Sequence, residues 1–136
     1  MLILVGFASF GQSEDSFRVV KRPVVARQVF RSFLLPPYSA NAALNVFTLD
    51  SNLISGDTLK LSSPSYRIKE YSLVVTSKGE IFKMGGLDGV IGYNFLQLTD
   101  RVKMLPGAIA FFTVEKLVNQ KGELRNTNMS FRIRLN

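Results

Sequence analysis

The stretch YRIKEYSLVVTSKGEIFKM, residues 66–84, alternates apolar and polar residues with the period of two that is typical of β-strands. Its apolar residues fall into two opposite phases: Tyr66 and Ile68 in the first, Tyr71, Leu73 and Val75 in the second. Because one extra residue moves side chains to the other face, the change of phase near Lys69-Glu70 predicts a β-bulge. Ser77-Lys78-Gly79-Glu80 is typical of a turn. These features predict a β-hairpin over residues 66–84.

Similar short runs lie on both sides of this hairpin. Strand-like alternation or apolar runs occur at 17–21, 29–35, 44–49, 59–61, 108–118 and 131–135. Pro36-Pro37 ends the second of these runs, because two prolines cannot continue a strand ladder. Gly85-Gly86-Leu87-Asp88-Gly89 predicts a flexible loop rather than a phosphate cradle, since β-like residues and an extended Tyr93-Asn94-Phe95 follow it.

One segment has the spacing of a helix. Leu98, Val102 and Leu105 lie at i, i+4 and i+7, Thr99 can cap the N-terminus, and Pro106-Gly107 ends the segment after one or two turns. The whole chain then predicts seven to nine strands and one short helix in a mainly β fold, a β-sandwich.

Composition restricts the chemistry. The chain has 136 residues, 46% of them hydrophobic, which suits one domain with a core of moderate size. It contains neither Cys nor His, so disulfides, Cys-ligated or His-ligated metals, thiol nucleophiles and Ser-His-Asp triads are excluded. Asp88 and Asp100 stand alone, and no local motif pairs two carboxylates for glycoside hydrolysis. We therefore expect no catalytic site, no cofactor and no metal.

The net charge of +7 favours anionic partners, although solubility alone explains such a charge equally well. No Asp or Glu occurs from Ser16 to Leu49, a stretch with five basic residues. Arg22, Arg27 and Arg31 are the candidate partner-binding residues, because guanidinium groups pair bidentately with carboxylates. The alternative is a solvated face whose aliphatic stems cover apolar surface. Aromatic and basic residues also alternate in places, but strands with inward aromatic side chains give the same pattern, so nucleic acid is not an expected partner.

The first 12 residues, MLILVGFASFGQ, form an uncharged and mostly apolar leader. A bilayer span needs roughly 20 apolar residues, so the leader predicts no membrane span. It is similar to the apolar region of a secretory signal peptide, with a small-x-small cleavage pattern at Ser9-Phe10-Gly11. We interpret 1–12 as a signal-peptide remnant and 13–136 as a single exported β-sandwich domain. An edge strand of the domain is the alternative for 1–12.

The C-terminal half resembles the last periplasmic domain of the GldM/PorM family, which belongs to the gliding-motility and type IX secretion machinery of Bacteroidetes. The segments that carry the resemblance are Tyr66–Leu73, Thr99–Gly107, Ala110–Val118, the turn Gly122-Glu123-Leu124-Arg125 and the closing strand Phe131-Arg132-Ile133; FRVVKRP at 17–23 resembles the first strand of that domain. The resemblance implies an immunoglobulin-like β-sandwich. The proteins of that family are longer and have several tandem periplasmic domains, so we interpret this chain as a single-domain relative.

The same resemblance implies a function. The chain is expected to be a non-catalytic, periplasmic or otherwise exported protein-interaction module whose partners are other envelope or secretion-complex proteins. An exported adhesin-like or glycan-binding module is the alternative, and exposed Tyr side chains near loops would favour it. Both homo-oligomeric and monomeric states remain open.

Overall fold

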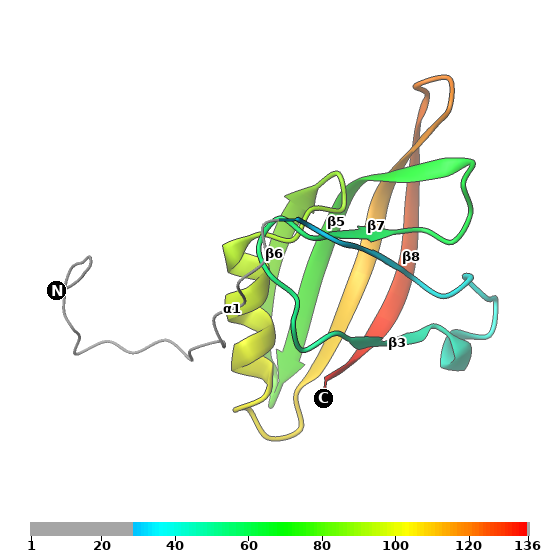
Figure 1. Ribbon diagram of the computed structural model, residues 1–136. Helices are drawn as coiled ribbons and strands as arrows, with labels where there is room; N and C mark the ends of the chain where they lie inside the picture. The colour runs from blue at the N-terminus through cyan, green and yellow to red at the C-terminus, as the bar shows by residue number, and fades with distance from the viewer. Residues whose placement is uncertain (1–28, 136) are drawn as a thin grey trace, which may run out of the picture.

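The structure of the protein is a computed structural model, and it describes residues 29–135. The leader 1–12 and two of the three candidate arginines, Arg22 and Arg27, lie outside the described residues. The described chain is mainly β, with seven strands, one α-helix and one 3-10 turn (Figure 1). In chain order these are β2 (Ser32–Leu34), η1 (Ala42–Leu44), β3 (Val46–Leu49), β4 (Thr58–Lys60), β5 (Tyr66–Ser77), β6 (Glu80–Leu87), α1 (Tyr93–Val102), β7 (Ile109–Asn119) and β8 (Leu124–Leu135).

The strands form a five-stranded sheet in the order β3-β8-β7-β5-β6 and a two-stranded sheet of β2 and β4. The pairs β8–β7, β7–β5 and β5–β6 are antiparallel, whereas β3 runs parallel to β8 and β2 parallel to β4. Helix α1 and the small sheet lie over the same face of the large sheet (Figure 1), and one apolar core joins them. The expectation of a mainly β, sandwich-like fold with one helix is confirmed.

The hairpin expected over residues 66–84 is present as β5 and β6, joined by a tight turn at Lys78-Gly79. Both turn residues have positive φ, 49° and 82°, which is why Gly79 suits this position. The register of β5 against β7 shifts on both sides of Glu70, which confirms the bulge near Lys69-Glu70. The bulge lets Ile68 and Tyr71 both reach the core despite their odd spacing.

The core consists mainly of side chains from the inner face of the large sheet. Five apolar side chains from the runs predicted as strands are fully buried: Leu73, Val75, Phe112, Val114 and Phe131. Phe112 lies at the centre of an aromatic cluster, stacked on Tyr71 with ring centroids 4.8 Å apart. Phe47 of β3 and Phe95 of α1 meet the same ring edge-on. This cluster joins β3, β5 and β7 to the helix.

The helix begins six residues before Thr99, so the prediction that Tyr93-Asn94-Phe95 is extended was wrong. Gly92 has extended backbone angles and occupies the cap position, and Thr99 lies in the helix interior, where its hydroxyl donates to the Leu96 carbonyl at 2.9 Å. The buried helix residues are Phe95, Leu96, Thr99, Asp100 and Val102. Burial of this stripe against the sheet outweighs the aromatic β-propensity of the first turn.

The prediction of a flexible loop at 85–89 was wrong for residues 85–87, because β6 runs through Gly85 and Gly86 to Leu87, whereas Asp88-Gly89 forms a turn. Gly86 lies opposite Tyr71, and a Cβ atom at position 86 would overlap the Tyr71 ring. The phenol donates a 2.6 Å hydrogen bond to the carbonyl of Val90. Gly86 is therefore a strand residue that makes room for a buried aromatic ring.

Candidate partner-binding site

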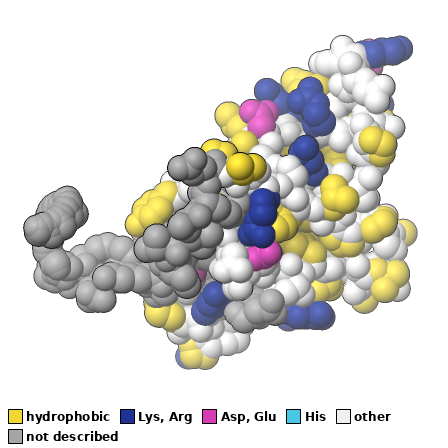
Figure 2. All heavy atoms as spheres, in the orientation of Figure 1, with side chains coloured by type: hydrophobic (Ala, Val, Ile, Leu, Met, Phe, Trp, Pro, Cys, Tyr) yellow, Lys and Arg dark blue, Asp and Glu magenta, His cyan; other side chains and the backbone are white. Residues whose placement is uncertain are grey.

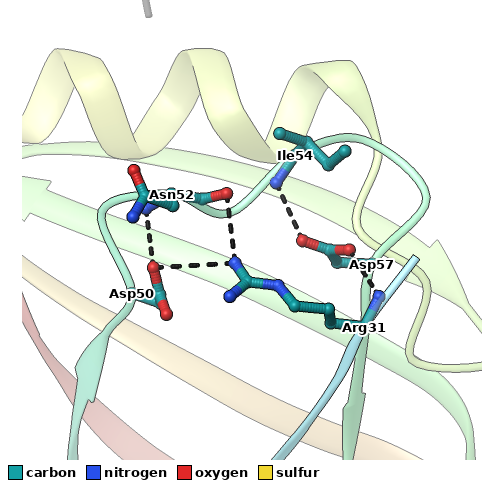
Figure 3. Close-up of polar contacts among 5 residues, drawn as sticks. All are labelled: Arg31, Asp50, Asn52, Ile54 and Asp57. Carbon is teal, nitrogen blue, oxygen red and sulfur yellow. Dashed lines mark hydrogen bonds and ion pairs between the residues drawn. The ribbon is translucent and has the colours of Figure 1, made fainter. Parts of the chain in front are cut away.

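Arg31 is the one candidate arginine that the structure describes, and it lies just before β2. Its guanidinium Nη2 is 3.8 Å from Asp50 Oδ1 and donates a 3.3 Å hydrogen bond to the Asn52 carbonyl (Figure 3). Its backbone N–H donates to Asp57 Oδ1 at 2.9 Å, and the N–H of Ile54 donates to Asp57 Oδ2 at 2.9 Å. Asp57 is fully buried. Arg31 and Asp57 together fasten the 50–57 loop to the start of β2.

Packing also holds the Arg31 side chain against the fold. The guanidinium carbon lies 4.7 Å from the centroid of the Phe33 ring, a cation–π contact. The side chain remains 40% exposed, and its Nε atom has no hydrogen-bond partner in the described part of the chain. Arg31 thus holds the 50–57 loop against the start of β2, while part of its side chain remains accessible to solvent. Its contact with a partner stays a prediction, as do the contacts of Arg22 and Arg27.

The outer edge of β6 is a second candidate surface. β6 is the last strand on one side of the five-stranded sheet, and no strand in residues 29–135 pairs with its outer edge. It has eight residues, contains no proline, and pairs with β5 along its whole length. Such an edge presents unpaired N–H and C=O groups to which a further strand can add.

The side chains of β6 differ between its two faces. Phe82 and Met84 pack against the core, whereas Ile81 and Leu87 are 71% and 59% exposed near the two ends of the strand. Lys83 lies between them, with its Nζ 3.6 Å from Glu115 Oε2. Glu115 also accepts a 2.8 Å hydrogen bond from the Ser72 hydroxyl. The β6 edge, defined as Glu80–Leu87, therefore combines a ladder that no strand of residues 29–135 covers with two exposed apolar side chains, the exposed Glu80 at its start and Lys83, whose charge is partly neutralised by Glu115.

A groove of about 480 Å³ lies between the small sheet and the start of β5, and this volume is in the range of ligand sites. Buried Leu59 and Ile68 form part of its lining, and the half-buried Leu61 and Tyr66 contribute more apolar surface. Lys60 and Arg67 also line it, together with a single carboxylate, Asp88. We call this the β4–β5 groove.

Cations surround the β4–β5 groove. Asp88 is 3.6 Å from Lys69, while Lys60 and Arg67 have no carboxylate partner among residues 29–135. The Arg125 guanidinium lies over the Tyr66 ring at 5.7 Å from its centroid. Figure 2 shows Lys and Arg side chains spread over this face of the molecule, with Asp and Glu side chains among them. The rim therefore has an excess of positive charge.

The carboxylates of residues 29–135 are spread over the molecule. Glu70 and Glu115 pair with lysines on the large sheet, Asp50 and Asp57 hold the Arg31 loop, and Asp88 is the only one that lines the β4–β5 groove. Over the same residues, no three Asp or Glu side chains lie close enough together to hold a metal ion. The described helices include none with the length and apolar character of a membrane span.

One titratable group has a clearly altered acidity. Burial raises the pKa of Tyr71 to about 12, because the phenolate is disfavoured away from water. Tyr71 belongs to the core, so the shift reports its packing against Gly86 and Phe112 rather than a reactive group.

Sequence reasoning missed both the β6 edge and the β4–β5 groove. The hairpin was visible in the alternation, but which of its strands ends the sheet depends on where β7 pairs. The β5–β7 pair that is nearest in sequence, Thr76 with Ile109, is 33 residues apart. Lys60 and Arg67 belong to a groove only because β4 and β5 meet in space. Their spacing in the sequence gives no sign of it.

Comparison with protein-family models, with curated proteins and with solved structures finds no match for this chain.

Proposed function

We propose that this protein is a non-catalytic, exported protein-interaction module, and that the β6 edge takes an extended segment of a partner protein as an added strand. The observation that carries the proposal is the open eight-residue edge with exposed apolar side chains near both ends. Backbone pairing supplies affinity in this mode of recognition, and alternate side chains supply specificity.

The surroundings of β6 favour an added strand. β5 and β7 lie behind β6 and hold it in a fixed register, and Phe82 and Met84 anchor it to the core. A partner strand would then meet a rigid template and would lose conformational freedom only on its own side. Ile81 and Leu87 offer it apolar contacts on the outer face, and Lys83 limits unspecific pairing of such an edge.

The resemblance of residues 66–133 to the last periplasmic domain of the GldM/PorM family suggests the class of partner. In this proposal the protein acts as a periplasmic scaffold of type IX secretion or gliding motility, and its partners are other envelope proteins of that complex. The sandwich-like fold and the open edge support a scaffold, because such a role needs a rigid body with a surface for strand addition.

Photo-cross-linking in the native host tests the proposal. A benzophenone amino acid replaces Lys83 on β6, and a matched variant carries it at Lys121, an exposed lysine in the β7–β8 turn. We expect position 83 to give discrete adducts with an envelope protein of the secretion or motility complex, and cell fractionation to recover the protein in the periplasm.

Several outcomes would contradict this function. Identical adducts from positions 83 and 121, or none from 83, would remove the β6 edge as the partner surface. An adduct of twice the chain mass would replace the envelope partner by a second copy of this protein. Recovery in the cytosol would end the assignment as an exported module.

The glycan-binding alternative has one observation in its favour. Tyr93 is 60% exposed where α1 begins, shortly after the Asp88-Gly89 turn, and exposed aromatic rings can stack on sugars. This alternative expects retention of the protein on envelope polysaccharide and loss of retention in Tyr93→Ala. Equal retention of both proteins would remove it.

A further inference from the structure

We propose that the β4–β5 groove is a separate binding site for an acidic peptide segment that carries a single apolar anchor residue. None of the residues that line it belongs to β6, so this site goes beyond strand addition at the β6 edge. The ligand class follows from two features of the groove, its apolar floor and its charged rim.

The floor accommodates one apolar side chain. Leu59 and Ile68 are 3% and 4% exposed and are fixed by strand pairing, because β4 pairs with β2 and β5 pairs with β7. Leu61 and the Tyr66 ring flank them, and Pro64 and Ser63 belong to the loop between the two strands. A leucine-sized side chain that enters this hollow replaces water mainly on Leu34, Leu61 and the Tyr66 ring, because Leu59 and Ile68 beneath them are already almost fully buried.

The rim selects the charge of the ligand. Lys60, Arg67 and Arg125 have no carboxylate partner in the described part of the chain, whereas Asp88 already faces Lys69 at 3.6 Å. A basic segment would find the one carboxylate of the groove, Asp88, already paired with Lys69, whereas an acidic segment would find Lys60 and Arg67 in the lining. Arg125 lies outside the lining, and its guanidinium already lies over the Tyr66 ring when no ligand is bound. Its side chain therefore loses less conformational entropy when it contacts a ligand.

An extended acidic peptide fits the shape better than a compact anion. The groove follows the loop 61–65 from the end of β4 to the start of β5, with Lys60 at one end of this loop and Arg67 just past the other. Cations placed on both sides of an apolar hollow match a peptide with carboxylates on both sides of an apolar residue. A free phosphate would reach one cation and leave the floor empty.

Fluorescence anisotropy with a labelled pentapeptide, Glu-Glu-Leu-Glu-Glu, tests this site on the full chain. Exchange of the central Leu for Gly should weaken binding about tenfold, because the anchor no longer buries apolar surface. The double variant Lys60→Glu/Arg67→Glu should weaken binding about five- to tenfold, because it removes two solvent-exposed ion pairs between the groove and the peptide. Raising the salt from about 50 mM to about 300 mM should weaken binding to the wild-type protein as well.

The matched control is Lys78→Glu/Lys121→Glu, which makes the same change of net charge at two exposed turn lysines outside the groove. It should bind the peptide within about twofold of wild type. As a second measurement on the unmodified protein, amide chemical shifts should move in residues 59–68 and at Asp88 when the peptide is added. This measurement does not depend on the variants folding.

The proposal is overturned if the control variant loses as much affinity as the groove variant, since net charge alone would then explain binding. It is also overturned if the Leu and Gly peptides bind equally, or if the moving amides lie elsewhere. Binding of a sulfated oligosaccharide at these amides without binding of the peptide would replace the acidic peptide by an acidic glycan. None of these outcomes depends on cross-linking from position 83, so the two sites can fail separately.

Discussion

The two edge strands of the five-stranded sheet, β3 and β6, differ in length and in the contacts that hold them. β3 has four residues and pairs in parallel with the last four residues of β8, Arg132 to Leu135. Just before it, the side chain of buried Asn45 exchanges two hydrogen bonds with the Ser39 backbone, at 2.8 and 2.9 Å, and the Asn45 carbonyl accepts from Arg132 N–H. β6 at the other edge has eight residues, and no described strand covers it.

This difference indicates which edge is suited to a partner. A short edge strand with a side-chain clamp offers little room for a further strand, and natural proteins use such devices against unwanted pairing. β6 has a single lysine, Lys83, in its interior and exposes Ile81 and Leu87 near its ends. β3 and its hydrogen bonds stabilise one end of the first edge, whereas no strand of residues 29–135 pairs with the outer side of β6; residues 124–131 of β8, beyond β3, are likewise not covered by a described strand.

Loss of the shared core should have the largest effect and disturb both edges together. Phe112 is fully buried and touches aromatic rings from β3, β5 and α1. Phe112→Ala should lower the free energy of unfolding by about 3–5 kcal/mol, measured by chemical denaturation. Phe111→Ala, its neighbour on the outer face, should cost less than about half as much. Equal losses would show that the core is not centred on Phe112.

The β6 edge should depend on the glycine that faces Tyr71. Gly86→Ala places a methyl group on the Tyr71 ring, which cannot move easily because its hydroxyl is bonded to the Val90 carbonyl. We expect a loss of about 1–3 kcal/mol in thermal or chemical unfolding. At Gly85 the nearest atom to an added Cβ is 3.6 Å away, an ordinary contact, so Gly85→Ala serves as the control and should change stability by well under about 1 kcal/mol. A smaller loss from Gly86→Ala than from Gly85→Ala would contradict the packing of Tyr71.

Alkaline pH should loosen the β6 side of the sheet through the same tyrosine. The pKa of Tyr71 is raised by burial to about 12 in the folded protein, above the value of 10.0 for an unperturbed tyrosine. The neutral phenol therefore stabilises the folded state fully below pH 10, and this contribution, on the order of 2 kcal/mol, is lost as the pH rises from about 10 to about 12.

Denaturation curves of the wild type and Tyr71→Phe check this effect, because the other titrating groups are common to both proteins. The wild type should lose more stability than the variant between about pH 10 and pH 12. Parallel losses in the two proteins would show that Tyr71 is not the buried acid.

Removal of the hydrogen bonds between the Asn45 side chain and the Ser39 backbone, next to β3, should lower the stability by a smaller amount. Asn45→Ala removes both side-chain hydrogen bonds to Ser39 and leaves the half-buried N–H and C=O groups of Ser39 without these partners, which should cost about 1–2 kcal/mol in chemical denaturation. Asn126→Ala, at an exposed position of β8, should stay within about 0.5 kcal/mol of wild type. Equal stability of the two variants would mean that Asn45 does not hold this edge.

The sequence predicted local structure better than the arrangement of the strands. The hairpin, its bulge and the five core side chains follow from alternation and from turn residues within 66–84 and nearby segments. The start of α1 and the path of β6 through Gly86 do not, because each depends on a distant aromatic ring, Phe112 for Phe95 and Tyr71 for Gly86. Local propensity cannot anticipate such tertiary contacts.

The binding surfaces were harder to anticipate for the same reason. Charge density singled out the 18–31 segment, and its one described arginine turns out to fasten the 50–57 loop through Asp50 and Asn52. The β6 edge is defined by strand order, and the β4–β5 groove by the meeting of two strands across a loop. Both are properties of the assembled fold rather than of any segment.

Amide hydrogen exchange tests the central claim most directly, because it compares the two sides of the sheet in one experiment. The chain is measured alone and in complex with the envelope partner identified by the position-83 cross-link. The account predicts that exchange in Glu80–Leu87 slows on binding, while exchange in 124–131 of β8, the stretch that β3 does not cover, stays unchanged. Unchanged exchange in β6, or protection confined to β8, would contradict strand addition at the β6 edge.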